Sequence, residues 1–173
     1  MIEKKMQDEI NKQINEELFS AYLYQSMAAY FAELNLNGFV NWMDQQVQEE
    51  LIHARKFYDY LIGRGGRVEL EAIEKPQKEW DSPLEVFEAA YGHEQHITKR
   101  INHMMDVAEE LKDRATISML QWFIDEQVEE EANTDESVQM LKRIGKDDHG
   151  LFMVDRELAK RPAPAATTTD NQE

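Results

Sequence analysis

Apolar residues recur along four long stretches of this chain, at steps that alternate between three and four residues. This spacing is typical of a helix that buries one face and exposes the other. The stretches predict helices at about 2–34, 39–62, 83–111 and 115–144. A shorter amphipathic stretch at 151–158 predicts a fifth helix. That helix is too short to be stable alone in water, so we expect it to dock on the others.

The connections between these stretches predict how the helices are arranged. Short turns at 35–38 and 112–113 make antiparallel neighbours of the first two helices and of the last two. Residues 67–81 have no helical period. An extended segment of that length spans roughly 50 Å, which exceeds the roughly 40 Å length of a helix of about 27 residues. We therefore expect this segment to cross the length of the bundle along its surface.

The predicted fold class is all-α: a four-helix bundle with a single long crossover, here between helices two and three, plus a short fifth helix. One domain is expected over residues 1–160. The segment 161–173 is rich in proline, alanine, threonine and polar residues, and we predict that it is a disordered tail.

Composition narrows the function classes. With 42% hydrophobic and 31% charged residues, the chain has the composition of a soluble globular protein. A net charge of −16 argues against binding to nucleic acid or to an anionic membrane, and it favours the attraction of cations. The lack of cysteine excludes disulfides, thiolate metal sites and thiol nucleophiles. No apolar run reaches the roughly 18 residues of a membrane-spanning helix, and the N-terminus has no apolar signal region, so we expect a cytoplasmic location.

Each of the four apolar stripes is interrupted near its middle by a polar residue. In chain order these residues are Glu17, Glu50, Glu94 and Gln127, and the interval from Glu17 to Glu50 recurs from Glu94 to Gln127. His53 and Glu130 follow Glu50 and Gln127 at a spacing of about one helical turn. Because mid-helix positions of a bundle meet at one level, we expect all six side chains to lie together.

A cluster of carboxylates in a bundle core needs positive charge. Burying each unpaired carboxylate costs on the order of several kcal/mol, and no lysine or arginine occupies the four stripes. A divalent cation would supply the charge, and oxygen ligands with one imidazole favour iron or manganese over copper or structural zinc. Glu50 could bridge two such ions. Two alternatives stay open: each polar residue is a hydrogen-bonded device that specifies packing, or the carboxylates of a purely structural bundle are protonated.

These residues, together with Tyr24, make the chain resemble the non-haem ferritins of bacteria and archaea over roughly residues 1–160. The resemblance implies that the bundle is a ferritin-like four-helix bundle. By this resemblance, Glu17, Glu50 and His53 hold a first iron ion. Glu50, Glu94 and Glu130 hold a second.

Other positions complete or limit the resemblance. Gln127 would be a hydrogen-bond partner or a weak ligand, and Tyr24 would donate an electron or a hydrogen bond; the alternative for Tyr24 is a tyrosine of the core.

Bacterioferritins and rubrerythrin-like proteins carry Glu-x-x-His in both halves, whereas the second copy here is Gln127-x-x-Glu130. Ile52 stands where bacterioferritins place a haem-ligating methionine, so no haem is expected.

A third iron site and a zinc pair are further hypotheses. By resemblance, a third iron ion would be held by Glu49, Glu126 and Glu129; the alternative is an acidic face in contact with solvent. His93 and His96 lie one turn apart on the third helix and would suit zinc, but exposed histidines are the simpler interpretation.

The function that the resemblance implies is iron storage and detoxification. A ferroxidase centre within each subunit would oxidise Fe(II) with dioxygen or peroxide, and the ferric mineral would collect inside a hollow homo-oligomeric shell of 24 subunits. A di-iron or di-manganese oxidase that stores no metal is an alternative, as is the purely structural bundle.

Overall fold

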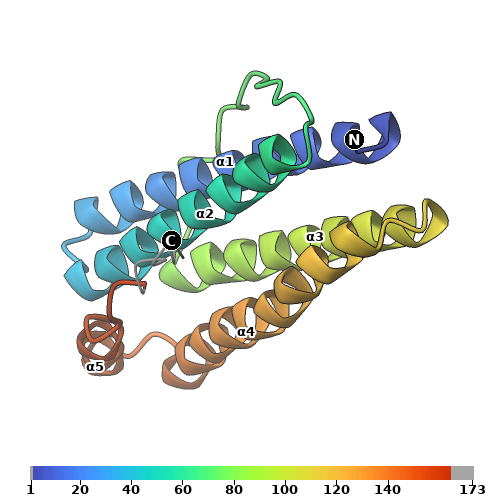
Figure 1. Ribbon diagram of the computed structural model, residues 1–173. Helices are drawn as coiled ribbons and strands as arrows, with labels where there is room; N and C mark the ends of the chain where they lie inside the picture. Colours follow the sequence, from blue (N-terminus) through green and yellow to red (C-terminus); the bar gives the residue numbers. More distant parts are fainter. Residues whose placement is uncertain (1, 165–173) are drawn as a thin grey trace, which may run out of the picture.

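The computed structural model describes residues 2–164, and within that part of the chain it contains helices but no strand. The helices are α1 (Lys4–Glu33), α2 (Asn37–Gly63), α3 (Pro83–Glu110), α4 (Arg114–Ile144) and α5 (Asp148–Leu158). Figure 1 shows α1 beside α2 and α3 beside α4, with α5 across the end of the bundle. The predicted all-α bundle with one long crossover and a short fifth helix is confirmed.

Local sequence signals account for where the helices begin and turn. The Ser82 side chain accepts a hydrogen bond from the Glu85 amide, and Pro83 occupies the first turn of α3, where a missing N–H costs nothing. Asp113 caps α4 in the same way, accepting from the Thr116 amide at 3.2 Å. These caps fix the register of the two helices that carry Glu94 and Gln127.

The crossover between α2 and α3 lies along α1, as predicted. The Asn11 side chain donates a hydrogen bond to the carbonyl oxygen of Arg67 at 3.0 Å, and Ser26 donates to the carbonyl oxygen of Gln77 at 2.7 Å. Near the end of the crossover, Trp80 is buried. Side chains of α1 thus satisfy backbone groups that a loop cannot pair internally.

The apolar core forms two clusters, with the level of Glu17 and Glu50 between them. One cluster includes Tyr24 and Phe87 and extends toward α5. The other includes Phe57 and reaches the opposite end of the bundle. The polar residues that interrupt the four stripes therefore occupy a level between two apolar regions, and this level is where the candidate site lies.

The fifth helix is fixed to the start of α2. A carboxylate oxygen of Asp155 accepts hydrogen bonds from the amides of Gly38 at 2.7 Å and Phe39 at 3.3 Å. These amides belong to the first turn of α2, which has no partner within its own helix. A Cβ atom on Gly38 would lie 1.6 Å from the backbone oxygen of Asp155, so only glycine permits this approach.

Part of the predicted disordered tail is described. Arg161 is half-buried against α2, while residues 165–173 lie outside the described residues, so the disorder of that part stays a prediction. Within residues 2–164, none of the helices combines the length and apolarity needed to span a membrane.

We predict that Gly38→Ala weakens the docking of α5. The new methyl group forces α5 away from α2, and overpacking of this kind typically costs about 1–3 kcal/mol. The free energy of unfolding, measured by urea denaturation, should fall accordingly. Gly92→Ala is the matched control, because a Cβ there meets nothing within 4 Å and the change within α3 should be neutral or stabilising. Equal stability of the Gly38→Ala and wild-type proteins would contradict this account of the docking.

Candidate metal centre

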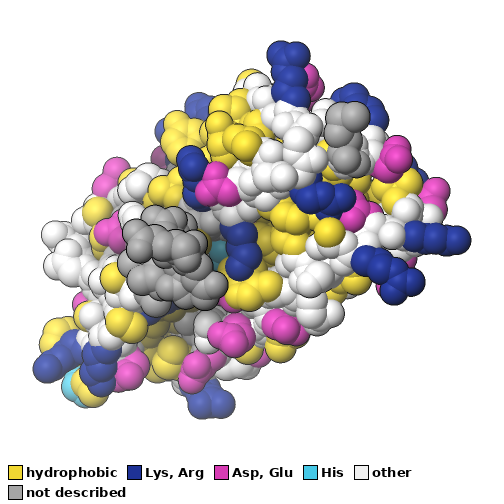
Figure 2. Space-filling view, viewed as in Figure 1, with side chains coloured by type: hydrophobic (Ala, Val, Ile, Leu, Met, Phe, Trp, Pro, Cys, Tyr) yellow, Lys and Arg dark blue, Asp and Glu magenta, His cyan; other side chains and the backbone are white. Residues whose placement is uncertain are grey.

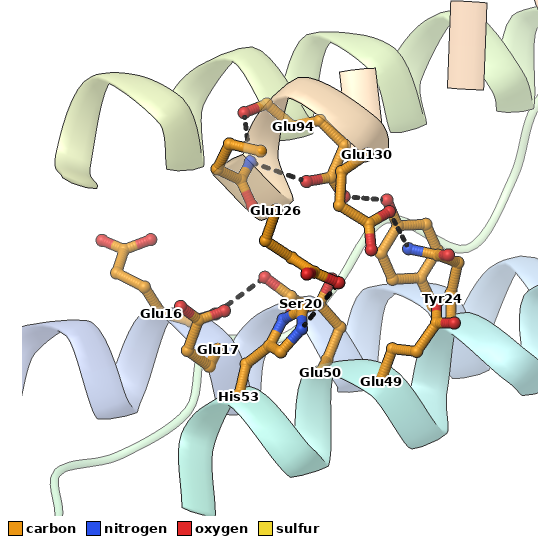
Figure 3. Close-up of polar contacts among 12 residues, drawn as sticks. Glu16, Glu17, Ser20, Tyr24, Glu49, Glu50, His53, Glu94, Glu126 and Glu130 are labelled. Carbon is orange, nitrogen blue, oxygen red and sulfur yellow. Dashed lines mark hydrogen bonds and ion pairs between the residues drawn. The ribbon is translucent and has the colours of Figure 1, made fainter. Parts of the chain in front are cut away.

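All four long helices contribute a polar side chain to one level of the core (Figure 3). Their side chains are almost completely buried, at 4% exposure or less, and they are Glu17 of α1, Glu50 and His53 of α2, Glu94 of α3, and Gln127 and Glu130 of α4. The sequence predicted that these six residues would meet, and the structure brings them together.

The first group of donors comes from α1 and α2. Oxygen and nitrogen atoms of Glu17, Glu50 and His53 lie within 4.8 Å of one another, and His53 Nδ1 is 3.4 Å from Glu50 Oε2. Gln13 donates a hydrogen bond to Glu17 Oε1 at 2.9 Å. The other oxygen, Glu17 Oε2, is buried and has no hydrogen-bond partner among the described residues. An unpaired carboxylate oxygen facing an imidazole and a second carboxylate is suited to binding a cation.

A second group of donors is centred on α4. Atoms of His53, Glu126 and Glu130 lie within 4.8 Å of one another, with His53 Nε2 3.8 Å from Glu126 Oε1. Gln46 Nε2 donates a hydrogen bond to Glu130 Oε2 at 3.0 Å. The imidazole of His53 therefore lies between Glu50 on one side and Glu126 on the other.

Glu94 belongs to neither of these groups and is held by its own partners. The Tyr24 hydroxyl donates to Glu94 Oε1, and Gln127 Nε2 donates to Glu94 Oε2 at 3.2 Å. Gln127 thus contacts Glu94 as a hydrogen-bond donor, which is one of the two roles expected for it. Tyr24 is completely buried and lies beside the site.

The three residues of the predicted third iron site have different surroundings in the structure. Glu126 contacts His53, whereas Glu49 forms an ion pair with Arg161 at 2.5 Å. Glu129 is exposed. The ligand sets for two iron ions and for a third ion stay predictions.

The histidines outside the centre contact other side chains. His93 Nε2 lies 2.7 Å from the Ser20 hydroxyl, and His96 Nε2 lies 3.0 Å from Glu16 Oε2. Burial and the neighbouring His96 lower the pKa of His93 to about 4. Neither histidine belongs to the groups of three metal-binding donors found among residues 2–164.

The carboxyl groups of the centre hold their protons unusually tightly. Burial and the neighbouring carboxylates raise the pKa of Glu50 to about 7 and that of Glu94 to about 8, and burial with the charge of Glu49 raises the pKa of Glu130 to about 7. Burial also raises the pKa of Glu17. For His53, burial lowers the pKa, but hydrogen bonds to Glu126 and Glu50 outweigh it and the pKa rises. In the absence of metal, protons neutralise the cluster near neutral pH.

Three contact residues of the centre did not stand out in the sequence. Gln13 and Gln46 each precede a predicted ligand by four residues, so helical spacing places them on the same face, one turn earlier. That four-residue spacing was the signal in the sequence that could have identified both glutamines. Arg161 gave no such signal, because its position depends on the docking of α5.

The fold and the site together define a ferritin-like bundle with a buried cluster of carboxylates and histidine. The family model of the ferritin-like domain matches residues 7–144. The chain is 41% identical over 161 residues to a bacterial non-heme ferritin of Staphylococcus haemolyticus, covering 93% of this chain and 97% of that protein. A bacterial non-heme ferritin of Bacteroides fragilis is 43% identical, covering 93% of this chain and 100% of that protein. A crystal structure of an open-pore ferritin from Archaeoglobus fulgidus shares 51% identity with a TM-score of 0.93, covering 94% of this chain and 100% of that one. The chain belongs to the ferritin family.

We predict that the metal-free protein loses stability as pH rises. The folded-state pKa values of Glu50, Glu94 and Glu130 lie above the ordinary value of 4.5, so between about pH 4.5 and 8 the folded state binds more protons than the unfolded state. The raised pKa of His53 acts in the same direction. The urea midpoint of chelator-treated protein should therefore be lower at about pH 8 than at about pH 5.5.

The variant Glu94→Gln provides the control, because it removes one titrating carboxyl group while keeping a similar shape. Its urea midpoint should depend less steeply on pH than that of the wild type. A wild-type midpoint that rises over this range would show that the core carboxyl groups are not protonated.

Proposed function

We propose that this protein is an iron-storage ferritin with ferroxidase activity at the buried centre. The observation that carries the proposal is the unpaired oxygen Glu17 Oε2, which lies among Glu50 and His53 in a site where no lysine or arginine of residues 2–164 pairs with Glu17, Glu50 or Glu94. Such a cluster is neutralised by protons or by cations. The likeness to bacterial non-heme ferritins supports iron as the cation.

The substrates of the reaction are two Fe(II) ions and an oxidant. Each Fe(II) loses one electron, and dioxygen takes up both electrons and two protons to give hydrogen peroxide; peroxide as the oxidant takes up two electrons and two protons to give two water molecules. Carboxyl groups such as Glu50 and Glu94 lose their protons when the ions bind. Because carboxylates are hard oxygen ligands, they favour the Fe(III) product over Fe(II).

The storage part of the proposal requires a multi-subunit shell. Phe152 and Met153 on α5 are more than half exposed, at 54% and 53%. Figure 2 shows hydrophobic side chains reaching the surface among charged ones on this face of the molecule. Apolar side chains on a docked helix are suited to contact with a neighbouring subunit. In the 24-subunit shell that the family resemblance implies, α5 would form such a contact and Fe(III) would collect in the interior.

Iron loading distinguishes this proposal from its two rivals. Purified protein is given an excess of Fe(II) in air and then separated by size. A ferritin gives a soluble large particle with an electron-dense core, whereas an oxidase that stores no metal gives oxidised iron without a core. A structural bundle binds no metal near neutral pH, and that result would refute the proposal entirely.

We predict that Glu50→Ala abolishes rapid Fe(II) oxidation and leaves the protein folded. Glu50 is grouped with Glu17 of α1 and with His53, whose Nδ1 lies 3.4 Å from Glu50 Oε2. Changes outside the ligand shell alone cost about 10–100-fold in metal affinity or activity. The initial rate of Fe(III) absorbance should fall by more than about 100-fold. The exposed Gln48→Ala change on the same helix is the control and should leave the rate unchanged. Rapid oxidation in Glu50→Ala would rule out this centre as the site of oxidation.

We predict that Tyr24→Phe slows oxidation without preventing ion binding. The change removes the hydroxyl that donates to Glu94 and leaves the ring in place. The loss of such a supporting contact typically costs about 10-fold or more in activity. Single-turnover oxidation should slow, while titration with Zn²⁺ should give the same number of bound ions as in the wild type. An unchanged rate would support the alternative that Tyr24 is only a residue of the core.

A further inference from the structure

The chain beyond α5 folds back onto α2 near the candidate centre. The Asn41 side chain donates hydrogen bonds to the backbone oxygens of Leu158 at 3.2 Å and Arg161 at 3.1 Å. With the contact between Asp155 and Gly38, these bonds hold the end of α5 and the following residues against α2. The position of Arg161 is therefore set by several independent contacts.

The Arg161 guanidinium lies along one face of α2. It forms an ion pair with Glu49 at 2.5 Å, donates to the side-chain oxygen of Gln46, and lies 4.4 Å from the centre of the Trp42 ring. Only 16% of the Arg161 side chain and 21% of the Glu49 side chain are exposed. Screening by water is weaker for a pair this buried than for one on the surface. The arginine is a built-in partner for Glu49.

Arg161 also reaches the centre through Gln46. A guanidinium can only donate hydrogen bonds, so it fixes the amide of Gln46 with its oxygen toward Arg161. The amide nitrogen then points at Glu130, to which it donates at 3.0 Å. Glu49 and Arg161 act on Glu130 in opposite directions, since the charge of Glu49 raises the pKa of Glu130 while that of Arg161 lowers it.

We propose that Arg161 occupies the place of a cation beside Glu49 and so excludes a third divalent ion from the carboxylates of Glu49 and Glu126. Glu126 Oε1 lies 3.8 Å from His53 Nε2, and Glu49 is close enough to both His53 and Glu126 for their charges to interact. A divalent ion that binds Glu49 competes with the guanidinium for the carboxylate oxygens, and the repulsion between the two cations lowers the affinity for the ion. Arg161 thereby favours occupation of the two inner positions over the third. This inference rests on the proposed function.

The test is a titration of the assembled, full-length, metal-free protein with Zn²⁺, which stays in one oxidation state. The variants Arg161→Met and Arg161→Gln remove the charge; methionine keeps the packing against Trp42, and glutamine keeps a hydrogen-bond donor near Gln46. Arg161→Lys keeps the charge and serves as the matched control. Isothermal titration calorimetry gives the number of ions and their affinities, and urea denaturation checks that each variant is folded.

We expect both neutral variants to bind a third ion at least about tenfold more tightly than the wild type does, which is within the usual range of coupling between sites. The wild type and Arg161→Lys should resemble each other, and all proteins should bind two ions equally well. Adding Glu49→Gln to Arg161→Met should remove the gain. If Arg161→Met loosens α5, Arg161→Gln still reports on the charge.

Two outcomes separate this inference from the proposed function. If all variants bind two ions and the affinity for a third is the same in the wild type and both neutral variants, Arg161 only anchors the chain and the inference is wrong. If the wild type binds no ions at Glu17, Glu50 and His53, the proposed function itself fails.

Discussion

The structure depends on the neutralisation of carboxyl groups buried between the two halves of its core. Glu17, Glu50, Glu94 and Glu130 are almost fully buried, and no lysine or arginine of the described residues pairs with the first three. Each helix must therefore present its carboxyl group at the same level, where the groups can share protons or cations. That requirement links the register of all four helices. The caps at Ser82 and Asp113 set where α3 and α4 begin, and so help to bring the polar side chains of these two helices to that level.

Much of the fold could be predicted from the sequence because it follows from periodicity. Apolar steps of three and four residues define the helices, and turns and one long unpatterned segment define their order. Glu17, Glu50 and Glu94 could be found because a charged residue inside an apolar stripe is energetically costly and so stands out. His53 and Glu130 could be found because they follow Glu50 and Gln127 by about one helical turn. Helical spacing then places each of them on the inner face of its own helix.

Other features depend on contacts between segments, which periodicity does not encode. In the sequence, Gln46 is one of several polar residues of α2, and only its contact with Glu130 in the structure distinguishes it. Arg161 follows a short helix in a segment with the composition of a disordered tail. Its place beside Glu49 results from the close approach of α5 to Gly38, a three-dimensional fit that no local pattern reveals. For the same reason, the sequence did not predict that Glu49 and Glu129 would lie in different surroundings.

The division of the core into two apolar clusters has a consequence for stability. Each cluster joins aromatic and aliphatic residues from several helices, and Tyr24, which donates to Glu94, belongs to one of them. The carboxylate level is therefore bounded on both sides by apolar packing. Under the proposed function, the charge of the level between the two clusters changes as ions bind and leave. The apolar packing on both sides stabilises the bundle by an amount that does not depend on that charge.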